Sequence, residues 1–447
     1  MPTRRTSPDQ ILAAALSQAG LRHTQQVYLR LLLTLWLVIP GRHNFTNLAR
    51  YGPTSDRTHR SWAKKPVPWV QLNSTLVLQA QDQQTLSRSG ILGVDAVFIP
   101  KYGTHTPDLA SYWSGCQGRA LRGLEGTCVT WIDPTTHQSV PLSITQTPAE
   151  LPAAQSRVDF YATVTLNTIL QLPDELKKQV QAVVGDAYYT KLKFIARVVD
   201  EGQLPFVGKM RKDANLKHLF TGPRTGKPGR PKLYAGKVSL YDFSRWEALP
   251  WADECMVYTV VAYSLSLKRQ VRVVAVVWPG SRRMEVLFST SITMTAATII
   301  ALYRARFSME FSFRDGKRPS VLMRSSVVFL GRTDPHQGPA RNRAALTKTG
   351  AVRDGKQFAG LNECQSRRVE ALHFHWNMAM MAVSAARLSQ LQDQRAGPLV
   401  FSMEDEKRRA YNAFFAERIL SILTVEQTDQ KREELLADLL ALGVKAA

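Results

Sequence analysis

Three acidic residues could do chemistry together because each follows or interrupts an apolar run, where a carboxylate is costly. Asp95 lies in the middle of Ile91–Ile99, Asp186 directly follows Val180–Gly185, and Glu310 lies in an apolar segment without proline. A buried charge must be paired, bind a metal or face a charged ligand. Oxygen-only ligands favour Mg²⁺ or Mn²⁺ over zinc. Three carboxylates could therefore hold two such ions for phosphodiester cleavage, although each acid alone could also be a satisfied structural acid.

The segment around Glu310 predicts a single helix over residues 299–317, with its only glycine next to last. At about 100° per residue, Tyr303, Arg306, Glu310 and Lys317 fall on one narrow stripe, with apolar side chains on both sides of it. An ordinary amphipathic helix keeps its charges opposite the apolar face. The pattern favours a site that receives a ligand, and a buried Glu–Arg ion pair is the structural alternative.

The charge balance indicates a polyanionic partner. The chain has 58 Lys and Arg against 36 Asp and Glu, a formal net charge of +22. Nucleic acid is the leading candidate for offsetting such an excess. A glycine- and proline-broken basic segment, residues 222–232, carries Arg224, Lys227 and Arg230. It could follow phosphates or a minor groove, and a solvated linker is an equally good interpretation.

The predicted elements place these residues in an α/β chain with helical ends. Residues 8–90 are expected to be helical, and two short helices at 44–52 and 55–65 suggest a helix-turn-helix or a small basic helical domain. Asp186 is expected at the carboxyl end of a strand, where ligands gather in open sheets. The remaining predictions are strands at 91–99 and 180–185, a hairpin of 126–132 with 140–144, helices at 160–170, 187–199, 366–392 and 403–442, and strands at 204–209, 238–243, 256–267, 271–278 and 284–288.

Several classes of protein are disfavoured by composition and motifs. The four cysteines form no CxxC pair, so neither a zinc module nor a disulfide framework is expected, which suits a reducing cytosol. The longest apolar run, residues 27–40, is too short to span a bilayer, so we expect a soluble cytoplasmic protein without a membrane partner. No G-x-x-x-x-G-K-S/T cradle occurs, which argues against a nucleotide cofactor. His373 and His375 would point to different faces of a helix and do not predict a metal site.

The spacing Tyr303-x2-Arg306-x3-Glu310-x6-Lys317 resembles, at all four positions, the YREK signature of one branch of bacterial insertion-sequence DDE transposases. The order of the chain is similar too, with an Asp on a strand, an Asp after a short strand, and a long strand-rich segment before the Glu helix. The resemblance implies a ribonuclease H-like catalytic core interrupted by a β-strand-rich insertion, with helical regions at both ends.

The same resemblance implies roles for individual residues. Asp95, Asp186 and Glu310 would hold two Mg²⁺ or Mn²⁺ ions, one activating the attacking water and the other stabilising the leaving oxygen. Tyr303, Arg306 and Lys317 would contact phosphates near the cleaved DNA end. Some relatives use an insertion-domain Trp to hold a flipped base. Trp246 and Trp251 are candidates here, although core packing is the alternative for both.

We therefore expect a cut-and-paste DNA transposase that cleaves double-stranded DNA at terminal inverted repeats and joins the 3′-OH to target DNA as a homodimer, associated with the bacterial nucleoid. The alternatives are a nuclease of the same fold without strand transfer, and a catalytically silent DNA-binding repressor. The expected regions are a helical DNA-binding region (1–88), the first part of the core (89–202), the insertion (203–290), the last part of the core with the Glu helix (291–395), and a helical region (396–447). Neither the repeat sequence nor a hairpin step can be read from the chain.

Overall fold

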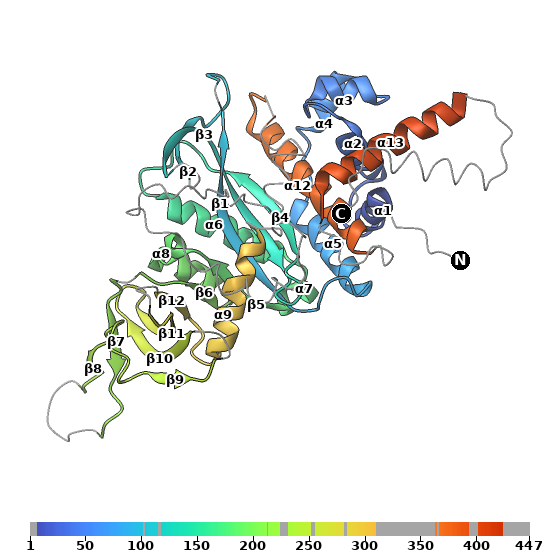
Figure 1. Ribbon diagram of the computed structural model, residues 1–447. Coiled ribbons are helices and arrows are strands. Elements are labelled where there is room, and N and C mark those ends of the chain that lie inside the picture. Colours follow the sequence, from blue (N-terminus) through green and yellow to red (C-terminus); the bar gives the residue numbers. More distant parts are fainter. Residues whose placement is uncertain are drawn as a thin grey trace.

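The computed structural model describes residues 7–101, 103–114, 118–211, 213–223, 231–251, 255–280, 284–309, 363, 366–392 and 401–422. Five strands build the core of its sheet in the order β4-β3-β1-β5-β6 (Figure 1). Strand β3 is antiparallel to β1 and β4, whereas β5 is parallel to β1 and to β6. The strands are β1 (Gly90–Pro100), β3 (Arg119–Ile132), β4 (Ser139–Gln146), β5 (Val180–Gly185) and β6 (Phe206–Lys209), and β2 (Ala110–Ser114) pairs with the start of β3. This arrangement confirms the predicted ribonuclease H-like core, including the β3–β4 hairpin.

Both faces of the core sheet are apolar, as the unbroken runs of β1 and β5 predicted. Leu92 and Val94 belong to a large hydrophobic cluster on the side of α6 (Arg157–Gln171). Ile91 belongs to a second cluster that includes residues of α9 (Ala296–Ala305). Alternate residues of β1 therefore face different helices, and α9 packs against β5, β6, β11 and β12.

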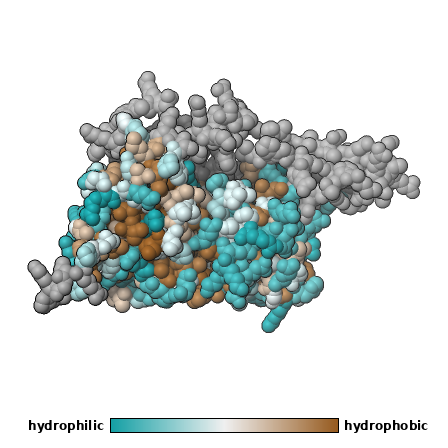
Figure 2. Space-filling model, turned by 90° about the horizontal axis from the view of Figure 1, so that it is seen from below, coloured by the Kyte–Doolittle hydropathy of each residue, from teal (hydrophilic) through white to brown (hydrophobic). Residues whose placement is uncertain are grey.

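The strand-rich insertion continues the core sheet outward from β6. The next strands in space are β12 (Met284–Ser289), β11 (Arg269–Val277), β10 (Met256–Ser264), β7 (Leu216–Leu219) and β8 (Tyr234–Lys237), and β9 (Glu247–Leu249) pairs with β10. Figure 2 shows hydrophobic side chains on the left half of the molecule, where this extension lies in Figure 1. Exposed apolar residues of the extension include Leu233, Tyr241, Met256, Leu265 and Ile292.

Three predicted elements differ from the structure: residues 238–243, residues 187–199, and the helix predicted over 299–317, which begins at Ala296 and tightens to a 3-10 turn at Arg306–Met309. Residues 238–243 form no strand, because the Ser239 hydroxyl accepts hydrogen bonds from the backbone N–H groups of Tyr241 and Asp242 and closes a turn. The single helix expected over 187–199 is instead a 3-10 turn (Ala187–Tyr189), a short α8 (Leu192–Ala196) and a π-helical turn (Arg197–Glu201). The break at Thr190 and Lys191 lets Thr190 donate to the carbonyl of Lys209 on β6.

Helices from both ends of the chain pack together on one side of the sheet (Figure 1). They are α1 (Pro8–Gln18), α2 (His23–Val38), α3 (Phe45–Tyr51), α4 (Asp56–Trp62), α5 (Trp69–Asp82), α12 (Val369–Leu391) and α13 (Met403–Ile422), and α7 (Asp174–Lys178) precedes β5. The Asn377 amide of α12 both donates to and accepts from the backbone of Ile144, which covers the free edge of β4. A bilayer-spanning length of apolar residues occurs in none of the described helices.

Candidate active site

The parallel pairing of β1 with β5 brings Asp95 and Asp186 together. Gly93 is paired with Val184, and each aspartate lies two residues beyond its member of that pair. Neighbouring strands are about 4.8 Å apart, and residues two apart share a face. Both carboxylates are therefore expected on the same face of the sheet, at adjacent positions. This is the face that carries Ile91 and Val184, which cluster with residues of α9.

Each aspartate is half-buried and oriented by a backbone hydrogen bond. Asp186 has extended backbone angles and caps the 3-10 turn that follows, its Oδ1 accepting from the N–H of Tyr188 at 2.8 Å. Asp95 Oδ1 accepts from the N–H of Ala96 at 2.9 Å. Within the described part of the chain, Asp186 takes part in no ion pair. Its second oxygen can therefore serve a ligand.

Tyr189, which sequence reasoning missed, lies near the two aspartates but belongs to the large hydrophobic cluster on the α6 side, with its ring centre 5.8 Å from that of Tyr161. Its side chain is buried, and burial raises the pKa of its phenol well above the usual value. The charges of Asp95 and then Asp186 raise this pKa further, so the phenol stays neutral and both carboxylates lie within electrostatic range. The hydroxyl has no hydrogen-bond partner among the described residues. The signal available in the sequence was the Tyr-Tyr pair at positions 188 and 189, separated from Asp186 by Ala187 alone.

The segment that leads to Glu310 reaches the strand that carries Asp95. After α9 the chain forms a 3-10 turn, Arg306–Met309, in which the carbonyl of Ser308 accepts a hydrogen bond from Ser139 Oγ at 3.2 Å. Met309 packs directly on Gly93, so closely that a Cβ at Gly93 would lie 2.3 Å from its sulfur. Gly93 and Asp95 share a face of β1. The residue before Glu310 is thus beside the aspartate pair, while Glu310 and Lys317 themselves lie outside the described residues.

The profile of the DDE superfamily endonucleases matches residues 12–276. The chain belongs to this family. The matched range contains Asp95 and Asp186 and ends before α9. No curated protein matches the chain. A solved structure, a cryo-EM piggyBac transposase synaptic complex with hairpin DNA, is 11% identical with a TM-score of 0.37, over 99% of this chain and 87% of that one.

Two further residues of the predicted site in this DDE endonuclease, Tyr303 and Arg306, are buried, at 3% and 4% exposure. The Arg306 guanidinium lies 5.5 Å from the ring centre of Tyr303 and 4.8 Å from that of Phe307. The helix differs from the prediction, because it begins at Ala296 and tightens to a 3-10 turn at Arg306. Since 3-10 residues advance by about 120°, the predicted stripe holds its α-helical geometry only as far as Ala305.

The other predicted DNA contacts lie in or beside the sheet extension. Trp246 is 7% exposed and packs edge-on against Phe243, with ring centres 5.4 Å apart, in the large hydrophobic cluster. This environment fits the core-packing interpretation of Trp246. Trp251 is half-buried against the smaller cluster. The predicted basic residues Arg224, Lys227 and Arg230 lie outside the described residues.

Proposed function

We propose that the protein is a cut-and-paste DNA transposase of the branch with the YREK signature, acting on a bacterial insertion sequence. The observation that carries the proposal is the pairing of Asp95 with Asp186 on adjacent parallel strands, with Met309 packed beside them in a DDE endonuclease. The net charge of +22 supports double-stranded DNA as the substrate.

The donor set fits divalent metal ions, which DDE endonucleases use. Asp95 and Asp186 offer carboxylate oxygens on one face, and we propose Glu310, which directly follows Met309 in the sequence, as the third ligand. Hard oxygen ligands suit Mg²⁺ or Mn²⁺. When bound, two such ions would supply activation of water and stabilisation of the leaving 3′-oxygen. Among the described residues there is no group of three potential ligands, and Glu310 lies outside them.

The protein's own residues would orient and confine this reaction. Backbone hydrogen bonds hold Asp186 and Asp95 in place. Tyr303, Arg306 and Lys317 would bind phosphates next to the cleaved bond. We further propose that residues 1–88 bind the inverted repeats, that a homodimer pairs two ends, and that the liberated 3′-OH attacks target DNA.

The decisive experiment incubates purified protein with Mg²⁺ and labelled DNA carrying the inverted repeats that flank the gene. The parent is expected to cut at the repeat ends and join them to a target plasmid. Asp186→Asn and Glu310→Gln should abolish cutting while preserving DNA binding. Asp174→Asn, which changes an exposed acid of α7, is the matched control and should cut like the parent.

Each alternative has its own outcome. Cutting without joining would identify a nuclease of the same fold. Binding without cutting by the parent protein would identify a repressor and reject both enzymes. Cleavage by Asp186→Asn at the parent rate would show that the aspartate pair is not the catalytic site.

A further inference from the structure

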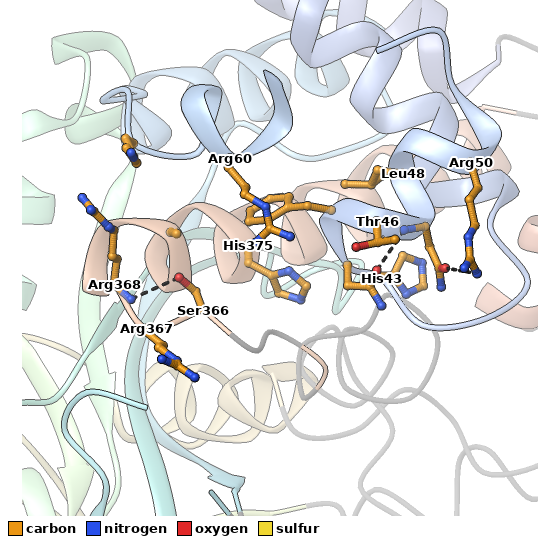
Figure 3. A pocket seen from close by; sticks show the side chains of 14 residues that line it. His43, Thr46, Leu48, Arg50, Arg60, Ser366, Arg367, Arg368 and His375 are labelled. Carbon is orange, nitrogen blue, oxygen red and sulfur yellow. Dashed lines mark hydrogen bonds between the residues drawn. The ribbon is translucent and has the colours of Figure 1, made fainter. Parts of the chain in front are cut away.

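A basic cleft lies where α3 and α4 meet the start of α12 (Figure 3). It has a volume of about 630 Å³. None of the described residues that line it is Asp or Glu, and five are basic: Arg50, Arg60, Lys64, Arg367 and Arg368. Arg50 lies on α3, Arg60 lies on α4 and Lys64 follows the end of α4, whereas the last two directly precede α12 in the C-terminal part of the chain.

Local contacts hold two of the arginines at the cleft. Asn44 caps α3 by accepting from the N–H of Asn47, and the Asn47 side chain in turn accepts from Arg50 at 3.3 Å. The Arg60 guanidinium lies 5.6 Å from the ring centre of Phe45, on the opposite helix. These contacts restrict both side chains before any ligand arrives, which lowers the entropy that binding must offset.

The helix that carries Arg60 is anchored to the core of the N-terminal helices. His59 is fully buried, and its two ring nitrogens contact the hydroxyls of Tyr28 at 2.9 Å and Thr54 at 2.8 Å. Trp62 stacks on Tyr28 with ring centres 4.6 Å apart. Helix α4 is therefore a fixed support for the cleft.

A second set of contacts joins the N-terminal helices to the segment before α12. The backbone N–H of His43 donates to the Glu363 carboxylate at 2.5 Å, and a ring nitrogen of His43 lies 2.9 Å from the carbonyl oxygen of Trp36. His375 of α12 packs edge-on against Trp36, with ring centres 5.0 Å apart. Burial lowers the pKa of His43, so the positive charge of the cleft comes from its arginines and lysine.

The ligand chemistry follows from this charge and shape. Five cations around one opening repel each other unless a multivalent anion neutralises them. The planar fork of arginine matches the oxygens of a phosphate. Asp56 lies 3.3 Å from Arg60, but the two side chains are 49% and 56% exposed, so this pair is weak and leaves Arg60 able to bind a phosphate.

We propose that the basic cleft binds the phosphate backbone of double-stranded DNA, so that the N-terminal helices and the residues before α12 hold one duplex together. This inference rests on the proposed function for its choice of DNA. It goes beyond that function because it assigns Arg367 and Arg368 to the DNA-binding surface and places the contact between two elements. A helix-turn-helix that binds DNA only through the face of α4 that carries Arg57, outside the cleft, would not require Arg367 and Arg368.

The test measures the affinity of the full chain for a short duplex across a series of salt concentrations. Arg60→Ala and Arg367→Ala should each reduce the slope of log K against log salt by about 1. The same loss weakens binding about tenfold at ~0.1 M salt. Lys178→Ala on α7 is the matched control and should keep the parent slope. Arg57→Ala, on α4 but outside the cleft, tests the alternative in which another face of that helix binds the DNA.

Two further measurements separate a binding defect from a folding defect. Arg60→Lys keeps the charge and should keep the slope while losing part of the affinity, and thermal unfolding should show equal stability for all variants. Parent-like slopes and affinities in Arg60→Ala and Arg367→Ala would overturn the inference. A reduced slope or affinity in Arg57→Ala, with parent-like values in the cleft variants, would also overturn it and would assign DNA binding to the face of α4 that carries Arg57. Tighter binding of inorganic phosphate or duplex RNA than of duplex DNA would reject the assigned ligand.

The outcomes also distinguish this inference from the proposed function. If Asp186→Asn abolishes cutting but the cleft variants bind like the parent, the transposase stands and the cleft is wrong. If the cleft variants lose salt-dependent binding but the parent never cuts, the cleft stands and the enzyme is wrong. A parent protein that binds no duplex rejects both.

Discussion

Replacing Gly93 with alanine tests whether the segment before Glu310 rests beside Asp95. A Cβ at position 93 would lie 2.3 Å from the Met309 sulfur and 2.6 Å from Ile132 Cδ1, so at least one side chain must move. Met309 is only 2% exposed, so its side chain has to shift within packed surroundings. Overpacking of this kind costs about 1–3 kcal/mol. Because 1 kcal/mol shifts the melting temperature by about 2–4 °C in proteins of 150–250 residues, we expect a decrease of a few degrees.

Gly93→Ala should reduce the rate of DNA cleavage strongly although it lowers the melting temperature by only a few degrees. Gly93 precedes Asp95 by two residues on the same strand face, and Met309 directly precedes Glu310. A shift of Met309 therefore changes the spacing between the proposed ligands. A displacement of about 1 Å can reduce the rate about 100-fold, and we expect a loss of that order in Mg²⁺-dependent cleavage of repeat-end DNA. Gly103→Ala is the control, since a Cβ there meets nothing within 4 Å.

A double-mutant cycle identifies the contact itself. Met309→Ala alone should destabilise the protein by about 2–5 kcal/mol through a cavity. In the Gly93→Ala background, Met309→Ala also removes the clashing sulfur. The double variant should therefore lose less unfolding free energy than the sum of the two single variants. Parent-like melting and cleavage for Gly93→Ala would refute the placement of Met309 on β1. Strict additivity in the cycle would show that the two residues do not touch.

Three other predictions concern buried polar groups. Asn377→Ala should lower the free energy of unfolding by about 1–3 kcal/mol, measured by urea denaturation, because it leaves the backbone groups of Ile144 unsatisfied. Burial lowers the pKa of Lys407 to about 8 from 10.5. The unfolded chain therefore binds the proton more tightly, and stability should rise between pH 8 and 10.5, by at most about 3 kcal/mol, with a smaller rise in Lys407→Met. Burial raises the pKa of Cys128 to about 12, so its thiol should resist iodoacetamide at pH 8 until the protein unfolds, as mass spectrometry would show.

Strands β1 and β5 of the core could be predicted because a short apolar run is a signal contained within the strand's own residues. The apolar runs of β1 and β5 marked buried strands, and the acids, one in the middle of the first run and one directly after the second, marked the candidate site. The register that pairs Gly93 with Val184 could not be read from these runs. Register depends on which long-range pairs bury the most side-chain surface, and an apolar strand fits several registers almost equally well.

The errors arose where side chains compete with the regular backbone pattern. Residues 238–243 alternate like a strand, but the Ser239 hydroxyl satisfies two backbone N–H groups and stabilises a turn. At Arg306 the helix tightens where the next residues pack onto β1, and this tertiary contact has no local sequence signal. The basic cleft could not be predicted for a related reason. Its cations come from α3–α4 and from residues preceding α12, and no local pattern shows that these distant segments lie together.

The burial of Tyr303 and Arg306 changes how their predicted role can be performed. A surface arginine binds phosphate in competition with water and salt. Arg306 instead lies within the protein beside two aromatic rings, where charge-assisted contacts are stronger because the local dielectric is lower. A guanidinium held there is already oriented and largely dehydrated, so a phosphate that reaches it gains more than at the surface. The position of Arg306 among apolar residues is therefore compatible with two roles. The guanidinium could bind a DNA phosphate at the edge of the cleavage site, or it could form an ion pair in the core. The cleavage and binding assays of Arg306→Lys, which keeps the charge but loses the planar fork, separate these two roles.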